Sequence, residues 1–417
     1  MTAYDSLEVH VELGGETVFA GHAQFHRNRG RLSSTTFQYD AGFLAHPQAY
    51  ALDPALDLVI GTQQTDGLPG AFSDAAPDRW GRNLIAKRER ALARAEPRRS
   101  RTLDDVDFLI GVSDVTRQGA IRFRLGAEAP FLDPESAVPK LVRLPELMRA
   151  AEAASRESGD AQLSAVKLLL AAGTGSLGGA RPKASVVDEG RQLIAKFPHH
   201  EDKWDVMAWE ATALDLAAKA GVSTPPHRLV EIGGRHVLLL DRFDRRGISR
   251  IGYMSAMSIL ERRDGEGGDY VDIAERLEEV SARAKSDARE LFRRVAVSIG
   301  INNTDDHLRN HGFIRERAGW VLSPAFDINP NPDPDVRQTT VAGADQPDDE
   351  AEGLRELGSV CRMSDSEIRG ELLRIAEVLD SWQQVATSNG VTRSELADFA
   401  DSIDHGVDTL RRSVSPS

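Results

Sequence analysis

The stretch NNTDDHLRNHGF, residues 302–313, holds two aspartates, two histidines and three asparagines in twelve positions. Side chains of these kinds bind metal ions, transfer protons or stabilise turns. Two spacings within the stretch predict different chemistry: a pair of histidines four residues apart, and an aspartate five residues before an asparagine. The choice between the two interpretations depends on whether the rest of the sequence supplies the other residues that each kind of site needs.

The histidine spacing belongs to His307 and His311, which on a helix would share one face, as in zinc proteases. That motif also requires a glutamate directly after the first histidine to act as general base. Position 308 is a leucine, and no third zinc ligand is marked elsewhere. A zinc hydrolase is therefore the weakest of the interpretations.

The second spacing joins Asp305 to Asn310. A protein-kinase catalytic loop presents an Asp that reaches the acceptor hydroxyl and, five positions later, an Asn that reaches a metal ion on the phosphates. Downstream, SPAFDINP places Asp327 where a kinase requires a second magnesium-binding carboxylate. Because D-x-x-x-x-N is common by chance, the remaining kinase parts must also be found in order.

A glycine-rich segment, GTGSLGGARPKASVV, lies upstream and satisfies G-x-G-x-x-G at Gly173, Gly175 and Gly178. A Walker A loop is excluded because Gly179 stands where that motif has lysine. A dinucleotide-binding fold needs a helix next, whereas Pro182 and the β-branched residues that follow predict a strand. Glycine loops between strands cradle phosphates in kinases, although a plain glycine turn is the alternative for this segment alone.

A lysine, a glutamate and a hinge strand complete the series. Lys196 ends the apolar run LIAKF, and Glu210 on the next predicted helix could pair with it; a solvated lysine and a surface glutamate are the alternatives. The strand HVLLLDRFDR then leads out of the predicted sheet, where a hinge would offer backbone groups to adenine. Together these parts occur in kinase order.

Three departures exclude an ordinary eukaryotic-type kinase. No His-Arg pair precedes Asp305, Asp327 is followed by Ile-Asn and not by Phe-Gly, and no Ala-Pro-Glu follows.

The periodicities predict an α+β fold. Alternating residues on both sides of Gly14-Gly15 predict a hairpin in a β-rich first part, and three prolines near residues 126–140 indicate a linker. We expect a β-rich subdomain over residues 1–126, a sheet-bearing kinase N-lobe with its hinge over residues 140–246, and a mostly helical C-lobe with the catalytic loop over residues 247–417.

Composition bounds the class of protein. The 417 residues carry a net charge of −14 and one cysteine, Cys361, without a long apolar run or a signal-peptide pattern, which together predict a cytoplasmic protein. So acidic a chain is a poor nucleic-acid binder by itself. The basic segment 79–101 is interpreted as a solvated helix face plus loop, with contact to an acidic partner or phosphate backbone as the alternative.

Seven motifs together resemble the HipA family, the serine/threonine kinase toxins of bacterial toxin–antitoxin modules. Five lie in the kinase part: GSLGGARPK, LIAKFP, LLDRFDR, NTDDHLRNHGF and LSPAFDINP. Two lie in the first part, GAFSDAAPDRWGR and LIGVSDVTRQGAIRF, and resemble the N-terminal subdomain of that family. The resemblance implies a β-rich subdomain beside a two-lobed, protein-kinase-like domain.

The resemblance also implies roles for single residues. Asp305 corresponds to the catalytic base, Asn310 and Asp327 to the magnesium ligands, Lys196 to the phosphate-binding lysine, and Asp241–Phe243 to the hinge. The implied ATP contacts are Gly178, Gly179, Ala180, Arg181, Pro182, Lys183, Lys196, Asp241, Arg242, Phe243, His307, Leu308, Arg309, Asn310, Phe326 and Asp327. Ser176 matches a serine whose autophosphorylation inhibits, since a phosphate adds about two negative charges where ATP must bind.

The function implied is that of a growth-arresting serine/threonine protein kinase that uses ATP and Mg²⁺. Family substrates include aminoacyl-tRNA synthetases, and the partner implied is a small helix-turn-helix, HipB-like antitoxin that makes most contacts to operator DNA; no membrane partner is expected. The alternative is a HipA-like binding protein that acts mainly as the partner of an antitoxin repressor. The filled catalytic positions favour the enzyme.

Overall fold

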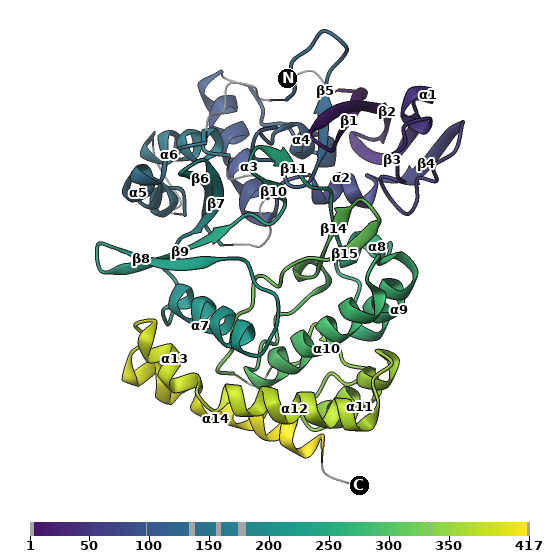
Figure 1. The fold of residues 1–417 in the computed structure, drawn as a ribbon. Helices are drawn as coiled ribbons and strands as arrows, with labels where there is room; N and C mark the ends of the chain where they lie inside the picture. Colours follow the sequence, from purple (N-terminus) through teal and green to yellow (C-terminus); the bar gives the residue numbers. More distant parts are fainter. Residues whose placement is uncertain are drawn as a thin grey trace. The chain divides into compact units, whose positions relative to one another are not determined.

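A computed structural model describes residues 4–96, 98–132, 138–155, 160–173, 181–333 and 335–414. The chain forms two compact units. The first unit contains Met1–His200 and Leu239–Met254, and the second contains Glu201–Leu238 and Ser255–Ser417. Figure 1 labels their elements along the chain.

A five-stranded antiparallel sheet begins the first unit, with strand order β4-β3-β2-β1-β5. Its strands are β1 Ser6–Leu13, β2 Glu16–Asn28, β3 Arg31–Tyr39, β4 Thr62–Asp66 and β5 Ile121–Arg124. The predicted hairpin at Gly14-Gly15 is confirmed. Phe37 of β3 and Phe123 of β5 both pack edge to face against Phe72, and all three side chains are fully buried.

The predicted β-rich N-terminal part is confirmed, and helices also contribute to this unit. They are α1 Ala41–Leu44, α2 Gly70–Asp74, α3 Arg79–Ala95, α4 Asp105–Ile110, a 3₁₀ turn at Leu141–Arg143, α5 Leu144–Ser155 and α6 Asp160–Ala171. The α3 helix follows an N-cap in which the Asp78 carboxylate accepts the Gly81 amide at 2.7 Å. The helix predicted in the basic segment 79–101 is therefore present, and α3 covers most of that segment.

The strands β6 Lys183–Asp188 and β7 Arg191–Lys196 pair antiparallel in the first unit. They belong to a four-stranded sheet in the order β6-β7-β9-β8, with β8 His227–Ile232 and β9 Arg235–Asp241, and the boundary between the units runs through β9. The short strands β10 Arg245–Arg246 and β11 Ser249–Arg250 form a ribbon after it. The strand predicted after Pro182 and the strand predicted from HVLLLDRFDR are therefore present as β6 and β9.

Helices dominate the second unit, as predicted. They are α7 Val206–Lys219, α8 Ala256–Ile259, α9 Tyr270–Val280, α10 Ala284–Gly300, a 3₁₀ turn at Leu308–Asn310, α11 Glu350–Val360, α12 Asp365–Leu379, α13 Trp382–Ser388 and α14 Arg393–Arg412. The strands are β12 Tyr253–Ser255, which begins in the first unit, β13 Gly268–Asp269, β14 Gly312–Glu316, β15 Gly319–Leu322 and β16 Thr339–Thr340. Capping boxes at Ser364 and Thr392 begin α12 and α14.

The core of the second unit is built where α7 and α10 meet α14. The Trp209 ring of α7 stacks on Phe399 of α14 with centroids 3.9 Å apart. A methyl group added at Gly406 of α14 would lie 2.4 Å from the Ile299 carbonyl oxygen, so glycine allows α14 to approach α10. The buried C-terminal end of α10 thus packs closely against α14 directly before residues 302–313.

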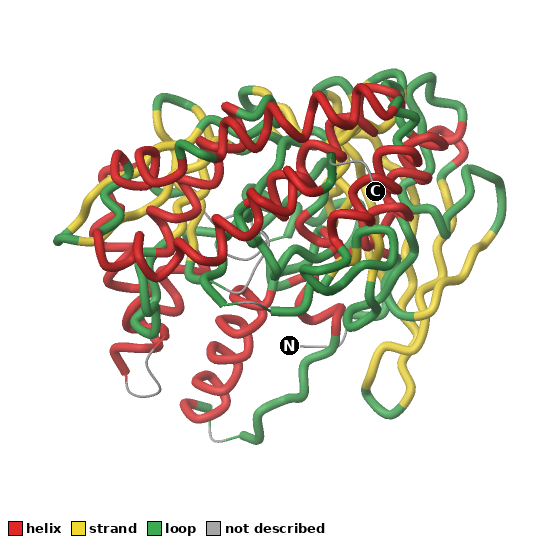
Figure 2. The backbone as a smooth tube through the Cα atoms, turned by 90° about the horizontal axis from the view of Figure 1, so that it is seen from below, coloured by secondary structure: helices red, strands yellow, loops and turns green. Residues whose placement is uncertain are grey.

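Figure 2 colours helices red and strands yellow, and both are plentiful, as an α+β fold requires. No helix in the described part of the chain is both long enough and apolar enough to cross a membrane.

Candidate active site

The candidate catalytic loop leaves the C-terminal end of α10 in a hydrogen-bonded turn. Asn302 has a positive φ of 53°, and the Asn303 amide donates to the Ser298 carbonyl at 2.8 Å. The Asn303 carbonyl in turn accepts from the Arg337 guanidinium at 2.9 Å, and Arg337 forms a buried ion pair with Glu350 of α11. The loop is thus anchored at its start, before the first candidate residue.

Asp305 and Asn310 differ sharply in exposure. The Asp305 side chain is exposed, whereas Asn310 ends the 3₁₀ turn Leu308–Asn310 and is buried. The Asn310 amide nitrogen donates to the Asp305 carbonyl at 3.5 Å, which leaves its amide oxygen available as a ligand. Gln338 Nε2 donates to Asp305 Oδ1 at 2.6 Å. A carboxylate that is exposed on an anchored backbone suits a group that must meet a second protein.

Asp327 lies on the segment after β15, which is hydrogen-bonded to the catalytic loop. The Asn329 amide donates to Asn303 Oδ1 at 3.4 Å, and Asn331 Nδ2 donates to Thr304 Oγ1 at 2.9 Å. Asp327 itself has a φ of 59°, a conformation uncommon for a residue with a side chain. Strain of this kind collects at functional sites, and it agrees with a required carboxylate at this position.

A buried polar network supports the loop from within the second unit. Asp306 accepts from the Tyr270 hydroxyl at 2.6 Å and from His311 Nε2 at 3.0 Å, and the Tyr270 and His311 rings meet edge to face. Burial alone would raise the pKa of Asp306, but His311 and Tyr270 outweigh it and lower that pKa. The same burial and the Asp306 charge raise the pKa of Tyr270 well above its ordinary value. These contacts give Asp306 and His311 a structural role beneath the loop.

The histidines do not share a helix face. The residues between them form a 3₁₀ turn, His311 has extended dihedrals, and its Nε2 is engaged by Asp306. His307 is half-buried, and its Nδ1 has no hydrogen-bond partner among the described residues. The same residues contain no group of three His, Cys, Asp or Glu side chains arranged to hold a metal ion. The helical geometry that the zinc interpretation needed is therefore wrong.

In the first unit, the two candidate lysines stand opposite each other in the β6–β7 ladder. Lys196 pairs in register with Lys183, and both are buried, so the alternative of a solvated Lys196 is wrong. The Lys183 ammonium pairs with the Asp78 carboxylate at 2.8 Å, with side chains only 1% and 6% exposed. Glu210 on α7 is fully buried, which excludes a surface glutamate. Because Lys196 and Glu210 belong to different units, their pairing stays a prediction.

The three residues of the predicted hinge, Asp241–Phe243, make different kinds of contact: an ion pair, buried polar hydrogen bonds and a ring contact. Asp241 pairs with Arg191 at 2.7 Å near the surface, and the Phe243 ring lies 6.1 Å from that of Tyr253. The Arg242 side chain is buried among polar groups of the first unit, and its amide donates to the Gln192 carbonyl at 3.2 Å.

The remaining candidates differ in burial and in whether they lie within the described residues. Arg181 is half-buried, while Pro182 is buried and its carbonyl accepts the Phe197 amide at 2.8 Å. Leu308 is buried against Gly268, Arg309 pairs with Asp264, and Phe326 is half-buried. The predicted positions Ser176, Gly178, Gly179 and Ala180 lie outside the described residues.

Sequence reasoning missed Gln338, Arg337 and Tyr270. None of the three stands at a fixed spacing from the catalytic loop, so no local motif could have marked them. Their contacts with Asp305, Asn303 and Asp306 exist only in the folded chain.

The donor set fits magnesium and a nucleotide. Asp327 and Asn310 offer carboxylate and amide oxygens, the hard ligands that Mg²⁺ prefers while it keeps several waters or phosphate oxygens. The orphaned Nδ1 of His307, two residues after Asp305, is a polar atom without a partner in the described protein. Such a group agrees with contact to a polar ligand at this loop.

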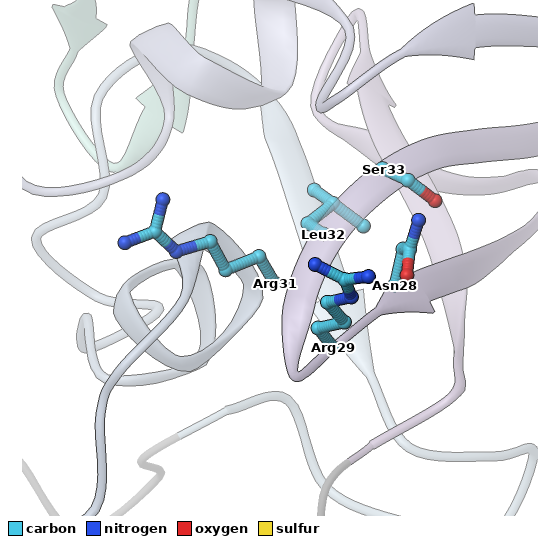
Figure 3. A pocket seen from close by; sticks show the side chains of 5 residues that line it. All are labelled: Asn28, Arg29, Arg31, Leu32 and Ser33. Carbon is cyan, nitrogen blue, oxygen red and sulfur yellow. The ribbon is translucent and has the colours of Figure 1, made fainter.

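A surface pocket of about 450 Å³ lies elsewhere, at the β2–β3 turn of the first unit. Figure 3 shows its lining, where the guanidinium groups of Arg29 and Arg31 diverge and do not converge on one point. None of the candidate catalytic residues lines it.

Two family models match the chain. The HipA-like C-terminal domain matches residues 175–408, and the HipA N-terminal domain matches residues 16–112. A curated relative from Sinorhizobium fredii, named "Putative kinase Y4mE", is 26% identical over 146 residues, which are 32% of this chain and 33% of that protein. The match thus spans about a third of the length of that relative.

Solved structures show the fold. The complex of Shewanella oneidensis HipA with HipB and operator DNA contains a chain that aligns with a TM-score of 0.70 at 16% identity, covering 97% of each chain. The Helicobacter pylori proinflammatory kinase CtkA aligns with a TM-score of only 0.45 at 14% identity, covering 58% of this chain and 95% of that one. The α+β fold class is confirmed. Since the C-terminal family match covers more than half of the sequence, the chain belongs to the HipA family.

Proposed function

We propose that this chain is an ATP- and Mg²⁺-dependent serine/threonine protein kinase of the HipA toxin type. The observation that carries the proposal is the geometry of residues 302–331. An exposed Asp305 stands on a backbone that is anchored at Asn303 and tied to the Asp327 segment, five residues before a buried Asn310. Membership of the HipA family supports the same reading.

The proposed chemistry is transfer of the γ-phosphoryl group. The acceptor hydroxyl oxygen forms a bond to the γ-phosphorus, the bond from that phosphorus to the β–γ bridging oxygen breaks, and ADP leaves. Asp305 accepts the hydroxyl proton, and its hydrogen bond from Gln338 orients one carboxylate oxygen. Asn310 and Asp327 would hold Mg²⁺, which neutralises charge on the phosphates.

The nucleotide would also be held by residues of the first unit. Lys196 is proposed to neutralise phosphate oxygens from strand β7, and Asp241–Phe243 to contact adenine through its backbone. Lys196 ends strand β7 and is buried, as a lysine that contacts phosphate inside a nucleotide site would be. The ion pair with Asp78 supports a mainly structural role for Lys183 in place of direct phosphate contact.

In the cell, the proposed role is arrest of growth by phosphorylation of a protein such as an aminoacyl-tRNA synthetase. Inhibitory autophosphorylation at Ser176 and a small HipB-like antitoxin with a helix-turn-helix are part of the proposal. The Shewanella oneidensis structure, which contains HipA, HipB and operator DNA, supports such a partner. The division of the kinase part into lobes at residues 140–246 and 247–417 is likewise proposed.

The alternative is a HipA-like protein that works mainly by binding an antitoxin repressor. The retained Asp305, Asn310, Asp327 and Lys196 disfavour it, because a binding protein gains nothing from keeping all four.

A phosphoproteome of growth-arrested cells separates the two functions. Cells that express the parent chain should show new phosphoserine or phosphothreonine on a translation protein, and cells that express Asp305→Asn at equal level should not. Equal arrest by both chains without new phosphorylation would favour the binding protein.

A further inference from the structure

The segment that follows β9 is fastened inside the first unit by a buried carboxylate, Asp244. Arg242 donates to it twice, from Nε to Oδ1 at 2.9 Å and from Nη2 to Oδ2 at 2.7 Å. Arg245 donates from Nη1 to Oδ2 at 2.8 Å. The three side chains are 1%, 5% and 4% exposed, in the order Arg242, Asp244, Arg245. Such charge-assisted bonds in the interior are strong and little screened by salt.

The same groups hold a distant loop, residues 113–119, through its backbone. The Gly119 amide donates to Asp244 Oδ2 at 2.8 Å, Arg242 Nη1 donates to the Thr116 carbonyl at 2.7 Å, and Arg245 Nη2 donates to the Arg117 carbonyl at 2.6 Å. Contacts to backbone atoms fix where the chain runs, and not only which side chains pair. Three hydrogen bonds therefore tie the backbone of residues 116–119 to the side chains of residues 242–245.

The loop 113–119 also touches the start of the glycine-rich segment. A methyl group added at Gly173 would lie 2.2 Å from Thr116 Cγ2, and the φ of Gly173 is +69°. Ser185 of β6 donates to the Gly173 carbonyl at 3.4 Å. One loop thus contacts two segments that carry candidate nucleotide residues: the glycine-rich segment at Gly173 and the hinge at Arg242.

Electrostatics make Asp244 the centre of this arrangement. Burial alone would raise its pKa, but Arg242 and Arg245 outweigh burial and hold the pKa of Asp244 well below its usual range. Burial, with repulsion from Arg242, lowers the pKa of Arg245 to about 9. Without the carboxylate, two guanidinium groups would face each other in the interior, which is costly.

We propose that Asp244 is a positioning residue for nucleotide binding, which holds Asp241–Phe243 in the conformation that accepts adenine by fastening it to loop 113–119. The inference rests on the proposed kinase function. Asp244 does not touch the nucleotide; it acts through Arg242 and Arg245. Loss of these hydrogen bonds reduces the fraction of molecules in which residues 241–243 have the conformation that binds adenine. The apparent Kd for ATP then rises by the inverse of that fraction.

The test compares Asp244→Asn with a matched control, Glu8→Gln. Glu8 is also a largely buried carboxylate of the first unit, 11% exposed, but it lies in strand β1, where it accepts from Arg124 at 2.6 Å and pairs with His10. Two quantities are measured on the full chain: the Kd for ATP with Mg²⁺ by calorimetry, and amide hydrogen exchange of residues 239–243 without nucleotide.

We expect Asp244→Asn to raise the Kd about tenfold, which corresponds to a hinge ready in about a tenth of the molecules, and to speed exchange of residues 239–243. Glu8→Gln should leave both within twofold of the parent. A milder variant, Arg245→Lys, keeps the charge but not the fork that reaches the Arg117 carbonyl, and should raise the Kd about threefold if Asp244→Asn does not fold.

Two results overturn this inference alone, provided that the parent still binds ATP. The first is an unchanged Kd in Asp244→Asn, or in Arg245→Lys if Asp244→Asn does not fold. The second is an equal rise of Kd in Asp244→Asn and Glu8→Gln. A parent chain that binds no nucleotide overturns the proposed function and this inference with it. The two failures are therefore distinguishable.

Discussion

The buried hydrogen bond from Tyr270 to Asp306 gives a sharp test of the catalytic-loop support. Tyr270→Phe keeps the ring against His311 and removes only the hydroxyl, whose bond to Asp306 Oδ2 is 2.6 Å long. The other donor to that oxygen, Ser298, is 3.4 Å away. A hydrogen bond to a buried charge contributes about 1.5–3 kcal/mol, so the free energy of unfolding should fall by about 2 kcal/mol.

Calorimetry at pH 7 should show this loss as a Tm lower by about 4–8 °C, since each kcal/mol lowers Tm by about 2–4 °C in a domain of about 150–250 residues. The loss should depend on pH. The pKa of Asp306 is lower in the folded chain, so its ionised form stabilises the fold above the unfolded pKa of about 3.9, and that contribution disappears as pH falls toward the folded pKa. The difference between parent and variant should therefore shrink below about pH 4.

Tyr39→Phe is the matched control, because it makes the same change at a neutral site. The Tyr39 hydroxyl donates to the Leu56 carbonyl at 3.1 Å and accepts the Leu52 amide at 2.9 Å. It should cost about 1 kcal/mol with no acid dependence. A Tm drop below 1 °C in Tyr270→Phe, or a drop equally large at pH 3.5 and pH 7, would refute the reasoning.

Three further changes test other parts of the structure. Lys183→Met should lower the free energy of unfolding by about 3–5 kcal/mol, because it removes the buried ammonium that pairs with the Asp78 carboxylate, and urea unfolding measures this; a fully stable variant with weaker ATP binding would instead make Lys183 a phosphate contact. Gly406→Ala should destabilise by about 1–3 kcal/mol in the same assay, because the new methyl group meets the Ile299 carbonyl; an unchanged midpoint would contradict the close packing of α14 on α10. Gln338→Ala should change stability by less than about 0.5 kcal/mol, since the pair it forms with Asp305 is exposed, and a larger loss would mean that the contact is structural.

Local patterns predicted most elements because each carries its own signal. The hairpin at Gly14-Gly15, the strand of residues 183–188 and the capping boxes at Ser364 and Thr392 follow from turn chemistry, alternation and side-chain caps that act within a few residues. The helices between β4 and β5 were less visible, since short helices such as α2 and α4 carry too few turns for a clear periodicity.

The candidate site was predictable where function demands a fixed spacing, as for Asp305 and Asn310. Its supports were not predictable, because Arg337, Tyr270 and Asp244 act across more than thirty residues of chain or through backbone atoms. The buried ion pair of Lys183 with Asp78 was unpredictable for the same reason, because its partners are far apart in the sequence. A lysine after a glycine loop resembles a phosphate ligand in sequence, and only the folded chain brings a carboxylate from before α3 to meet it.

The proposed function requires that the chain transfers a phosphoryl group from ATP and that this transfer depends on Asp305. The most direct measurement incubates purified parent and Asp305→Asn with γ-labelled ATP and Mg²⁺, and records label on protein together with the nucleotide-induced shift in Tm. The parent should become labelled, Asp305→Asn should lose the label by about 10²–10⁴-fold, and both chains should keep the Tm shift. Equal labelling of the two chains, or no label and no Tm shift with the parent, would contradict the proposed function.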